Sequence, residues 1–200
     1  MILPRRNSLS LLSMILGLAF LMTGNFLTAE NKVLGEIDFD GATKVEKTAG
    51  VWVDGQYVGY LEELKGSKSV LLLPGPHQIV VRQAGYEDFV QSVSVQPGDK
   101  HLVPVTLVKD PRYKMPQVTA EVKFSVDPDR AAVFVDGLFV GHAGELGRGL
   151  LVAPGKRKIT ISLPGFESFE SVVDLAPNQK FTLKTKLLKT AASPDAPPSI

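Results

Sequence analysis

Histidine offers the most versatile chemistry in this sequence, because an imidazole can bind a metal or transfer a proton near neutral pH. The chain has three histidines, His77, His101 and His142, and no cysteine. None of the three lies within metal-ligand spacing of another, so we predict no metal site and give none of them a catalytic role. We expect His77 and His101 to be exposed residues at strand ends.

Two aspartates, Asp54 and Asp136, could in principle work as a pair of catalytic carboxylates. Each directly precedes a glycine at the same place in two similar stretches, so turn formation is the better interpretation. Residues 38–41, Asp-Phe-Asp-Gly, are similar to the start of a calcium-binding loop. They lack the later ligands and the terminal glutamate of such a loop, so we interpret them as a polar turn. We therefore predict no catalytic residue and no cofactor.

Both aspartates lie in a stretch that occurs twice, at residues 51–59 and 133–141. Valine and aromatic residues flank Asp54-Gly55 and Asp136-Gly137, and Asp-Gly suits the two-residue turn of a β-hairpin. With this turn, the first hairpin pairs Val53 with Gln56, Trp52 with Tyr57, and Val51 with Val58. We expect the second hairpin to repeat the arrangement, with valines on one face and aromatic residues on the other.

The aromatic face of each hairpin is the strongest candidate for a partner-binding surface. It carries Trp52 and Tyr57 in the first copy, and Phe134 and Phe139 in the second. Trp and Tyr combine a large apolar area with a polar tip, which suits stacking on a sugar or anchoring a protein. The alternative is that these rings cover the sheet or pack between the two copies. If Trp52 is buried, we expect the loops at residues 60–68 and 142–149 to carry the binding.

The sequence beyond the hairpins also repeats, which predicts two domains of one fold. Asp54 and Asp136 are 82 positions apart, whereas the Pro-Gly pairs at residues 74–75 and 154–155 are 80 apart. Short alternating or apolar runs with turn signals between them predict an all-β fold, with no convincing helical period after residue 29. We expect a buried strand at residues 70–73, a short apolar run at residues 150–152 in the second copy, and an edge strand around Pro104, which cannot donate to a ladder.

These boundaries predict two small Ig-like β-sandwiches in tandem after an N-terminal signal or anchor helix. We place them at residues 35–108 and 118–188, with a linker at 109–117 and a disordered tail at 189–200. Residues 1–29 have a basic start and an apolar run typical of an export signal, either cleaved or kept as a membrane anchor. Without them the chain has 20 basic and 21 acidic residues, which gives no electrostatic argument for nucleic-acid binding.

The repeated motifs resemble those of the PEGA domain. They comprise Val-aromatic-Val-Asp-Gly, a glycine four residues beyond the turn glycine, Pro-Gly before a strand, and Gly-aromatic-Glu at 85–87 and 165–167. The family is named for a Pro-Glu-Gly-Ala start, which the second copy matches as Pro128-Asp129-Arg130-Ala131. The first copy departs from it with residues 46–49, Glu-Lys-Thr-Ala. The resemblance implies prealbumin-type sandwiches on bacterial or archaeal envelope proteins, without catalysis of their own.

We therefore expect a non-catalytic extracytoplasmic module, periplasmic, secreted or on the cell surface, that binds an envelope protein or a cell-wall glycan. It would meet a membrane only through its N-terminal segment, and it would not bind nucleic acid. A structural spacer tethered by an uncleaved leader is the alternative. A hydrolase is a remote third, because no nucleophile, base and orienting group can be assembled from these motifs.

Overall fold

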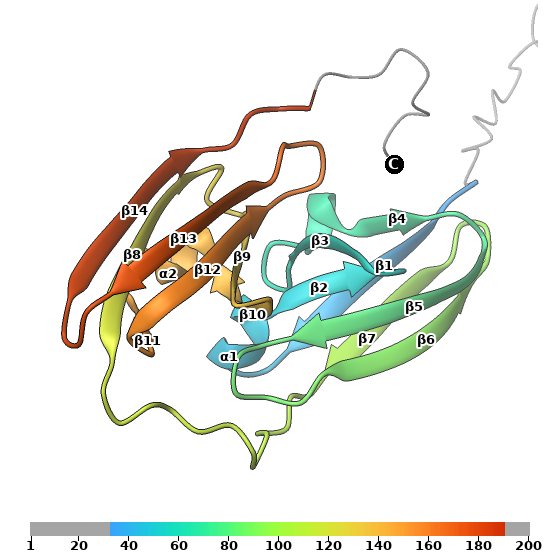
Figure 1. Ribbon diagram of the computed structural model, residues 1–200. Coiled ribbons are helices and arrows are strands. Elements are labelled where there is room, and N and C mark those ends of the chain that lie inside the picture. Colours follow the sequence, from blue (N-terminus) through green and yellow to red (C-terminus); the bar gives the residue numbers. More distant parts are fainter. Residues whose placement is uncertain (1–32, 191–200) are drawn as a thin grey trace, which may run out of the picture. The chain divides into compact units, whose positions relative to one another are not determined.

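The computed structural model describes residues 33–190 (Figure 1). The predicted export signal and most of the predicted tail lie outside the described residues. Within the described part, no helix is long and apolar enough to cross a membrane. The two copies of the repeat are called repeat 1 and repeat 2 below, and residues that occupy the same place in both are called equivalent.

Repeat 1 has seven strands, one short α-helix and one 3₁₀ turn in the described chain. The strands are β1 (Gly35–Gly41), β2 (Gly50–Val53), β3 (Gln56–Tyr60), β4 (Val70–Leu72), β5 (Gly75–Arg82), β6 (Phe89–Val95) and β7 (Lys100–Val105). Helix α1 (Lys44–Thr48) lies between β1 and β2, and the 3₁₀ turn η1 (Gly66–Lys68) precedes β4. Another short helix, α2 (Ala143–Leu146), lies in repeat 2. Its position there is equivalent to that of loop 60–68 in repeat 1.

Repeat 2 uses the same order of strands. They are β8 (Ala120–Asp127), β9 (Ala132–Val135), β10 (Leu138–His142), β11 (Leu150–Val152), β12 (Gly155–Ser162), β13 (Phe169–Leu175) and β14 (Lys180–Lys186). The two repeats therefore have the same order of strands, as the sequence predicted.

Each repeat is a sandwich of two sheets. In repeat 1 the sheets have the orders β4-β1-β7 and β3-β2-β5-β6, and in repeat 2 they have the orders β11-β8-β14 and β10-β9-β12-β13 (Figure 1). Ile37 and Phe39 of one sheet pack with Val51, Ile79 and other residues of the second sheet to form the repeat 1 core. Apolar residues from both sheets exclude water there, which is the main force that holds such a sandwich together. The predicted all-β fold is confirmed.

The hairpins follow the predicted register at the turn and depart from it further along. Trp52 pairs with Tyr57 as expected, but Val51 pairs with Gly59 instead of Val58 because a β-bulge shifts the register. Gly59 has φ +149°, and a Cβ on it would lie 3.1 Å from the Glu63 side chain. A β-bulge often needs a glycine at such a position. The second hairpin has the same shift, with Gly141 paired to Val133.

Two local predictions were wrong. Residues 38–41 form the end of β1 instead of a polar turn, because Phe39 is a buried core residue of a continuous strand. Strand β4 is an edge strand beside β1, and its Leu71 is half exposed, so this run is not buried. Residues 33–190 contain two single-turn α-helices, α1 and α2, and these are too short to give the helical period that the sequence lacks. The edge position expected for Pro104 is confirmed, since β7 lies at the edge of its sheet.

Helix α1 stands where repeat 1 departs from the Pro-Glu-Gly-Ala start. Thr43 and Glu46 form a capping box: the Thr43 side chain accepts from the Glu46 amide, and the Glu46 carboxylate accepts from the Thr43 amide at 2.8 Å. The buried Glu46 carboxylate also accepts from the Leu107 amide. These bonds, led by the one from Thr43, hold the pKa of Glu46 below its usual value. Repeat 1 thus has a capped helical turn at the place where repeat 2 has Pro128-Asp129-Arg130-Ala131.

Candidate functional site: the contact between the repeats

The aromatic faces of the two hairpins lie against each other. The ring centroid of Trp52 is 5.2 Å from that of Tyr57 in its own hairpin and 5.0 Å from that of Phe139 in the other. The edge-to-face geometry of Trp52 with Phe139 and Phe134 is a favourable one for aromatic pairs. The guanidinium carbon of Arg82 lies over the Trp52 ring at 5.0 Å. Trp52, Tyr57 and Phe139 are 5%, 6% and 8% exposed, so these rings are packed in the contact.

Equivalent residues meet each other in this contact, as they do at a two-fold axis. Trp52 lies near its equivalent Phe134 at 6.5 Å, and Tyr57 near its equivalent Phe139 at 6.4 Å. A third pair, Tyr60 and His142, stacks with ring centroids 3.9 Å apart and planes 10° apart. A contact between the same surface patch on two copies is the mark of an isologous interface. The two repeats therefore pair as the subunits of a symmetric dimer do.

Polar contacts at the side of the aromatic cluster break this symmetry. The Tyr57 hydroxyl donates to the Arg130 carbonyl at 3.1 Å, and the Arg130 guanidinium donates to the Val58 carbonyl at 3.0 Å. The Nε atom of Arg130 lies 3.2 Å from Oε1 of Glu63, at an ion-pair distance without hydrogen-bond geometry. Lys68 is a second cation, 3.7 Å from the same oxygen. Burial of the Tyr57 hydroxyl, with the nearby Glu63 charge, raises the pKa of Tyr57.

Two cavities flank the aromatic cluster, and both repeats line each of them. The larger has a volume of about 890 Å³ and is lined by Tyr57, Glu63, Lys68, Arg130 and Phe166 among others. The smaller, of about 650 Å³, has walls that include Tyr86, Tyr113, Phe134, Phe139 and Arg157. We call them the Arg130 cavity and the Tyr86 cavity. Their size is that of small-molecule and peptide-side-chain sites, and both combine aromatic surface with charged groups.

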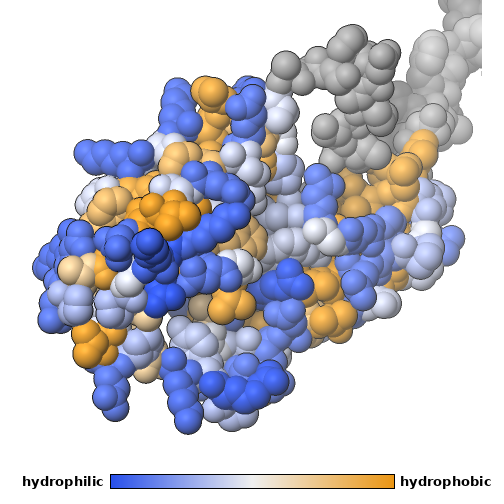
Figure 2. Space-filling view, in the orientation of Figure 1, coloured by the Kyte–Doolittle hydropathy of each residue, from blue (hydrophilic) through white to orange (hydrophobic). Residues whose placement is uncertain are grey.

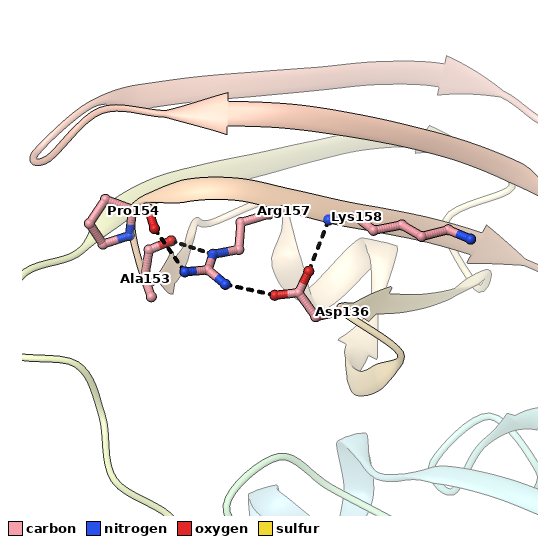
Figure 3. Close-up of polar contacts among 5 residues, drawn as sticks. All are labelled: Asp136, Ala153, Pro154, Arg157 and Lys158. Carbon is pink, nitrogen blue, oxygen red and sulfur yellow. Dashed lines mark hydrogen bonds and ion pairs between the residues drawn. The ribbon is translucent and has the colours of Figure 1, made fainter.

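The structure places Asp54 and Asp136 in the hairpin turns, where each has positive φ, at 50° and 52°. Their carboxylates also hold the neighbouring strand. The Asp136 carboxylate accepts from the Lys158 amide and from the Arg157 guanidinium, each at 2.9 Å, and Arg157 donates to the carbonyls of Ala153 and Pro154 (Figure 3). Partial burial favours the protonated carboxyl group, but the bonds from Lys158 and Arg157 outweigh it and lower the pKa of Asp136.

Repeat 1 builds the same anchor with a histidine. The Asp54 carboxylate lies 2.7 Å from Nδ1 of His77 and accepts from the Gln78 amide at 2.8 Å, while Nε2 of His77 lies 2.8 Å from the Leu73 carbonyl. His77 is equivalent to Arg157. The bond to Asp54 and then the bond to Leu73 raise the pKa of His77, and the bond from His77 lowers the pKa of Asp54. The anchor of repeat 1 is therefore titratable near neutral pH, whereas that of repeat 2 is permanently charged.

We expect the stability of repeat 1 to fall as the pH rises through the pKa of His77. A histidine whose pKa is higher in the folded state contributes stability below its unfolded pKa, and that contribution is lost when the folded form deprotonates. Asp54 is half exposed, so the change should be below about 1 kcal/mol. The His77→Arg variant copies repeat 2 and should flatten the dependence, as measured by urea unfolding from pH 5.5 to 8.5. An equal slope in both proteins would contradict this assignment.

The structure brings the predicted aromatic residues together and keeps the histidines apart. Tyr57, Phe134 and Phe139 each contribute to a cavity wall, whereas Trp52 contributes to neither. His142 is buried, which the sequence did not indicate, and its Nδ1 has no hydrogen-bond partner. Among the described residues, no three histidine, aspartate or glutamate side chains are placed to hold a metal ion. A partner-binding role for the four aromatic residues stays a prediction.

This arrangement defines a class of protein: an all-β chain with two small β-sandwiches in tandem, paired through equivalent hairpins. The family model of the PEGA domain matches residues 45–111 and 120–191, more than half of the chain. The chain belongs to the PEGA domain family, with two copies of the domain. A search of curated proteins found no match.

Two solved structures are similar to the chain at low identity. The Bacillus anthracis TIE protein is 17% identical, with a TM-score of 0.28 over 78% of this chain and 34% of that one. GBS52, the minor pilin of Streptococcus agalactiae, is 9% identical, with a TM-score of 0.23 over 83% of this chain and 99% of that one. The chain thus spans about a third of the length of the first.

Proposed function

We propose that this chain is a non-catalytic extracytoplasmic interaction module that binds an envelope protein or a cell-wall glycan. The observation that carries the proposal is the Arg130 cavity, which brings the predicted binding loop at residues 60–68 next to the predicted aromatic residue Tyr57. The loop supplies Glu63, Leu64 and Lys68 to its wall. Neither repeat forms this cavity alone, so the paired repeats would be the binding unit.

The chemistry of the cavity suits a ligand that is partly apolar and partly polar. Phe166 supplies aromatic surface, which stacks on sugar rings and packs on apolar side chains, while the buried Tyr57 ring borders the cavity. The Arg130 and Lys68 side chains are 42% and 66% exposed, so both cations can reach a polar or anionic group of a ligand. Phe166 is half-buried and keeps part of its ring accessible. A peptide segment and a glycan chain both meet these requirements.

The matched variants Phe166→Ala and Tyr86→Ala test the proposal. Phe166 and Tyr86 are equivalent residues, but the first lines the Arg130 cavity and the second lines the Tyr86 cavity. We expect the full chain to bind purified cell-wall fragments or an envelope extract, and Phe166→Ala to weaken that binding by about tenfold. Tyr86→Ala should bind as the wild type does. Retention on neither material, or equal loss in both variants, would contradict the proposal.

A tethered spacer is the second candidate, and the packing between the repeats favours it. Two sandwiches joined through a buried aromatic cluster keep a fixed arrangement better than two domains on a flexible linker. In that case the leader would stay uncleaved and hold the paired repeats at a membrane. N-terminal sequencing of the exported protein tests this: a chain that begins near residue 25 or 30 speaks against a tether at the N-terminus.

A further inference from the structure

Strand β6 is an edge strand that nothing in its sequence protects. It lies at the end of the sheet β3-β2-β5-β6 and pairs only with β5 within the described chain. Alternate residues of such a strand direct free N–H and C=O groups away from the sheet, where another strand can pair with them. Its seven residues, Phe-Val-Gln-Ser-Val-Ser-Val, contain no charge and no proline. Among the described edge strands it is the longest of this kind.

The other long edges carry the features that usually prevent pairing. Strand β7 contains Pro104, which has no N–H to donate. Strand β14 carries three lysines. Strand β13 is the equivalent of β6, and it has Glu170 and Asp174 where β6 has Val90 and Ser94. Charged residues on an edge are a common means of preventing pairing with another chain.

We propose that β6 pairs with β6 of a second copy of this chain, in an antiparallel arrangement about a two-fold axis. If Ser92 lies opposite Ser92 of the copy, then Val90 lies opposite Ser94 of the copy. In this register the exposed side chains of both strands lie on the same face of the joined sheet. No charge is buried and no like charges meet in this register. The same register on β13 would set Glu170 opposite Asp174, which repel. The difference between the two equivalent strands therefore selects β6 as the edge that joins two chains.

The exposure of β6 agrees with this role. Val90 is 56% exposed although it is a large apolar residue, and Ser92 and Ser94 are exposed as well. Val90 also borders Val80 of β5, which is buried in the contact between the repeats. On the face seen in Figure 2, hydrophobic side chains form separate patches among hydrophilic ones. Main-chain hydrogen bonds along the strand would supply the affinity, as in β-augmentation.

The first test transfers the charges of β13 onto β6. We expect the full chain to form a dimer whose population rises with concentration in sedimentation equilibrium, and the Val90→Glu/Ser94→Asp variant to weaken that dimer by about tenfold or more. Both positions are exposed, so the variant should keep the circular dichroism spectrum of the wild type. The reverse change, Glu170→Val/Asp174→Ser, removes the two acidic side chains from β13. This strand should then also pair with another copy, so that assemblies larger than a dimer form. A wild type that stays monomeric at every soluble concentration, or a variant that dimerises unchanged, would overturn the proposal.

A second test fixes the register with a disulfide, which the chain permits because it has no cysteine. Residues directly opposite each other in an antiparallel pair have Cα atoms about 4.5–5.5 Å apart, within the range that a disulfide spans. Under mild oxidation, Ser92→Cys should form a covalent dimer. The matched control Val172→Cys, at the equivalent position of β13, should stay largely monomeric. Equal crosslinking of both variants would refute pairing through β6. This outcome does not depend on whether the Arg130 cavity binds an envelope ligand.

Discussion

Replacing Trp52 by alanine is expected to lower the free energy of unfolding by about 3–5 kcal/mol, the usual cost of emptying a large buried aromatic site. Trp52 is 5% exposed, and it contacts Tyr57 within repeat 1 and Phe139 in repeat 2. Its loss removes packing from both repeats at once. Urea unfolding followed by circular dichroism measures the effect, because the variant lacks the only tryptophan. We also expect the transition to broaden as the repeats unfold more independently.

The matched control is Trp52→Phe, because phenylalanine is the residue that repeat 2 has at the equivalent position, Phe134. It keeps an aromatic ring and leaves a smaller cavity, so its cost should be about 1 kcal/mol. A Trp52→Ala variant within about 0.5 kcal/mol of the wild type would mean that the hairpins do not stabilise each other. A large loss in Trp52→Ala with a small one in Trp52→Phe would show that aromatic packing joins the repeats.

The sequence predicted much of this contact because the hairpin rules are local. Asp54-Gly55 and Asp136-Gly137 give turns with positive φ, and the alternation of side chains then sets the aromatic residues on one face. Packing between the copies was one of two interpretations of that face. The bulge could not be predicted from alternation, which continues straight past Val58. The glycine four residues beyond each turn was the available signal, since Gly59 and Gly141 both have positive φ in the bulge.

The polar contacts between the repeats depend on positions that no local rule connects. Arg130 and Glu63 are far apart in the sequence and meet only when the hairpins pair. Their role has no signature in composition or spacing. The anchor of each turn was closer to prediction, because His77 and Arg157 are equivalent basic residues soon after Pro-Gly. Comparison of the copies at that position would have indicated a shared partner for Asp54 and Asp136.

Replacing Arg130 by alanine is expected to lower the free energy of unfolding by about 2 kcal/mol. The Glu63 side chain is 6% exposed, and in the variant Lys68, at 3.7 Å and 66% exposed, is the one cation among the described residues at ion-pair distance from its carboxylate. A buried carboxylate that loses its closest cation is poorly solvated, and this raises the free energy of the folded state. The Val58 carbonyl loses its donor in the same change. Urea unfolding of the full chain gives the loss directly.

The double variant Glu63→Gln/Arg130→Ala separates the charge from the packing. If the cost comes from an uncompensated carboxylate, a neutral amide at residue 63 should restore part of the stability, so the double variant should unfold at higher urea than Arg130→Ala alone. If the cost comes from lost contacts of the arginine side chain, the second change should restore nothing. Losses of packing do not depend on the charge of Glu63. Only the first result would therefore show that the ion pair of Arg130 with Glu63 stabilises the contact between the repeats beside the aromatic cluster.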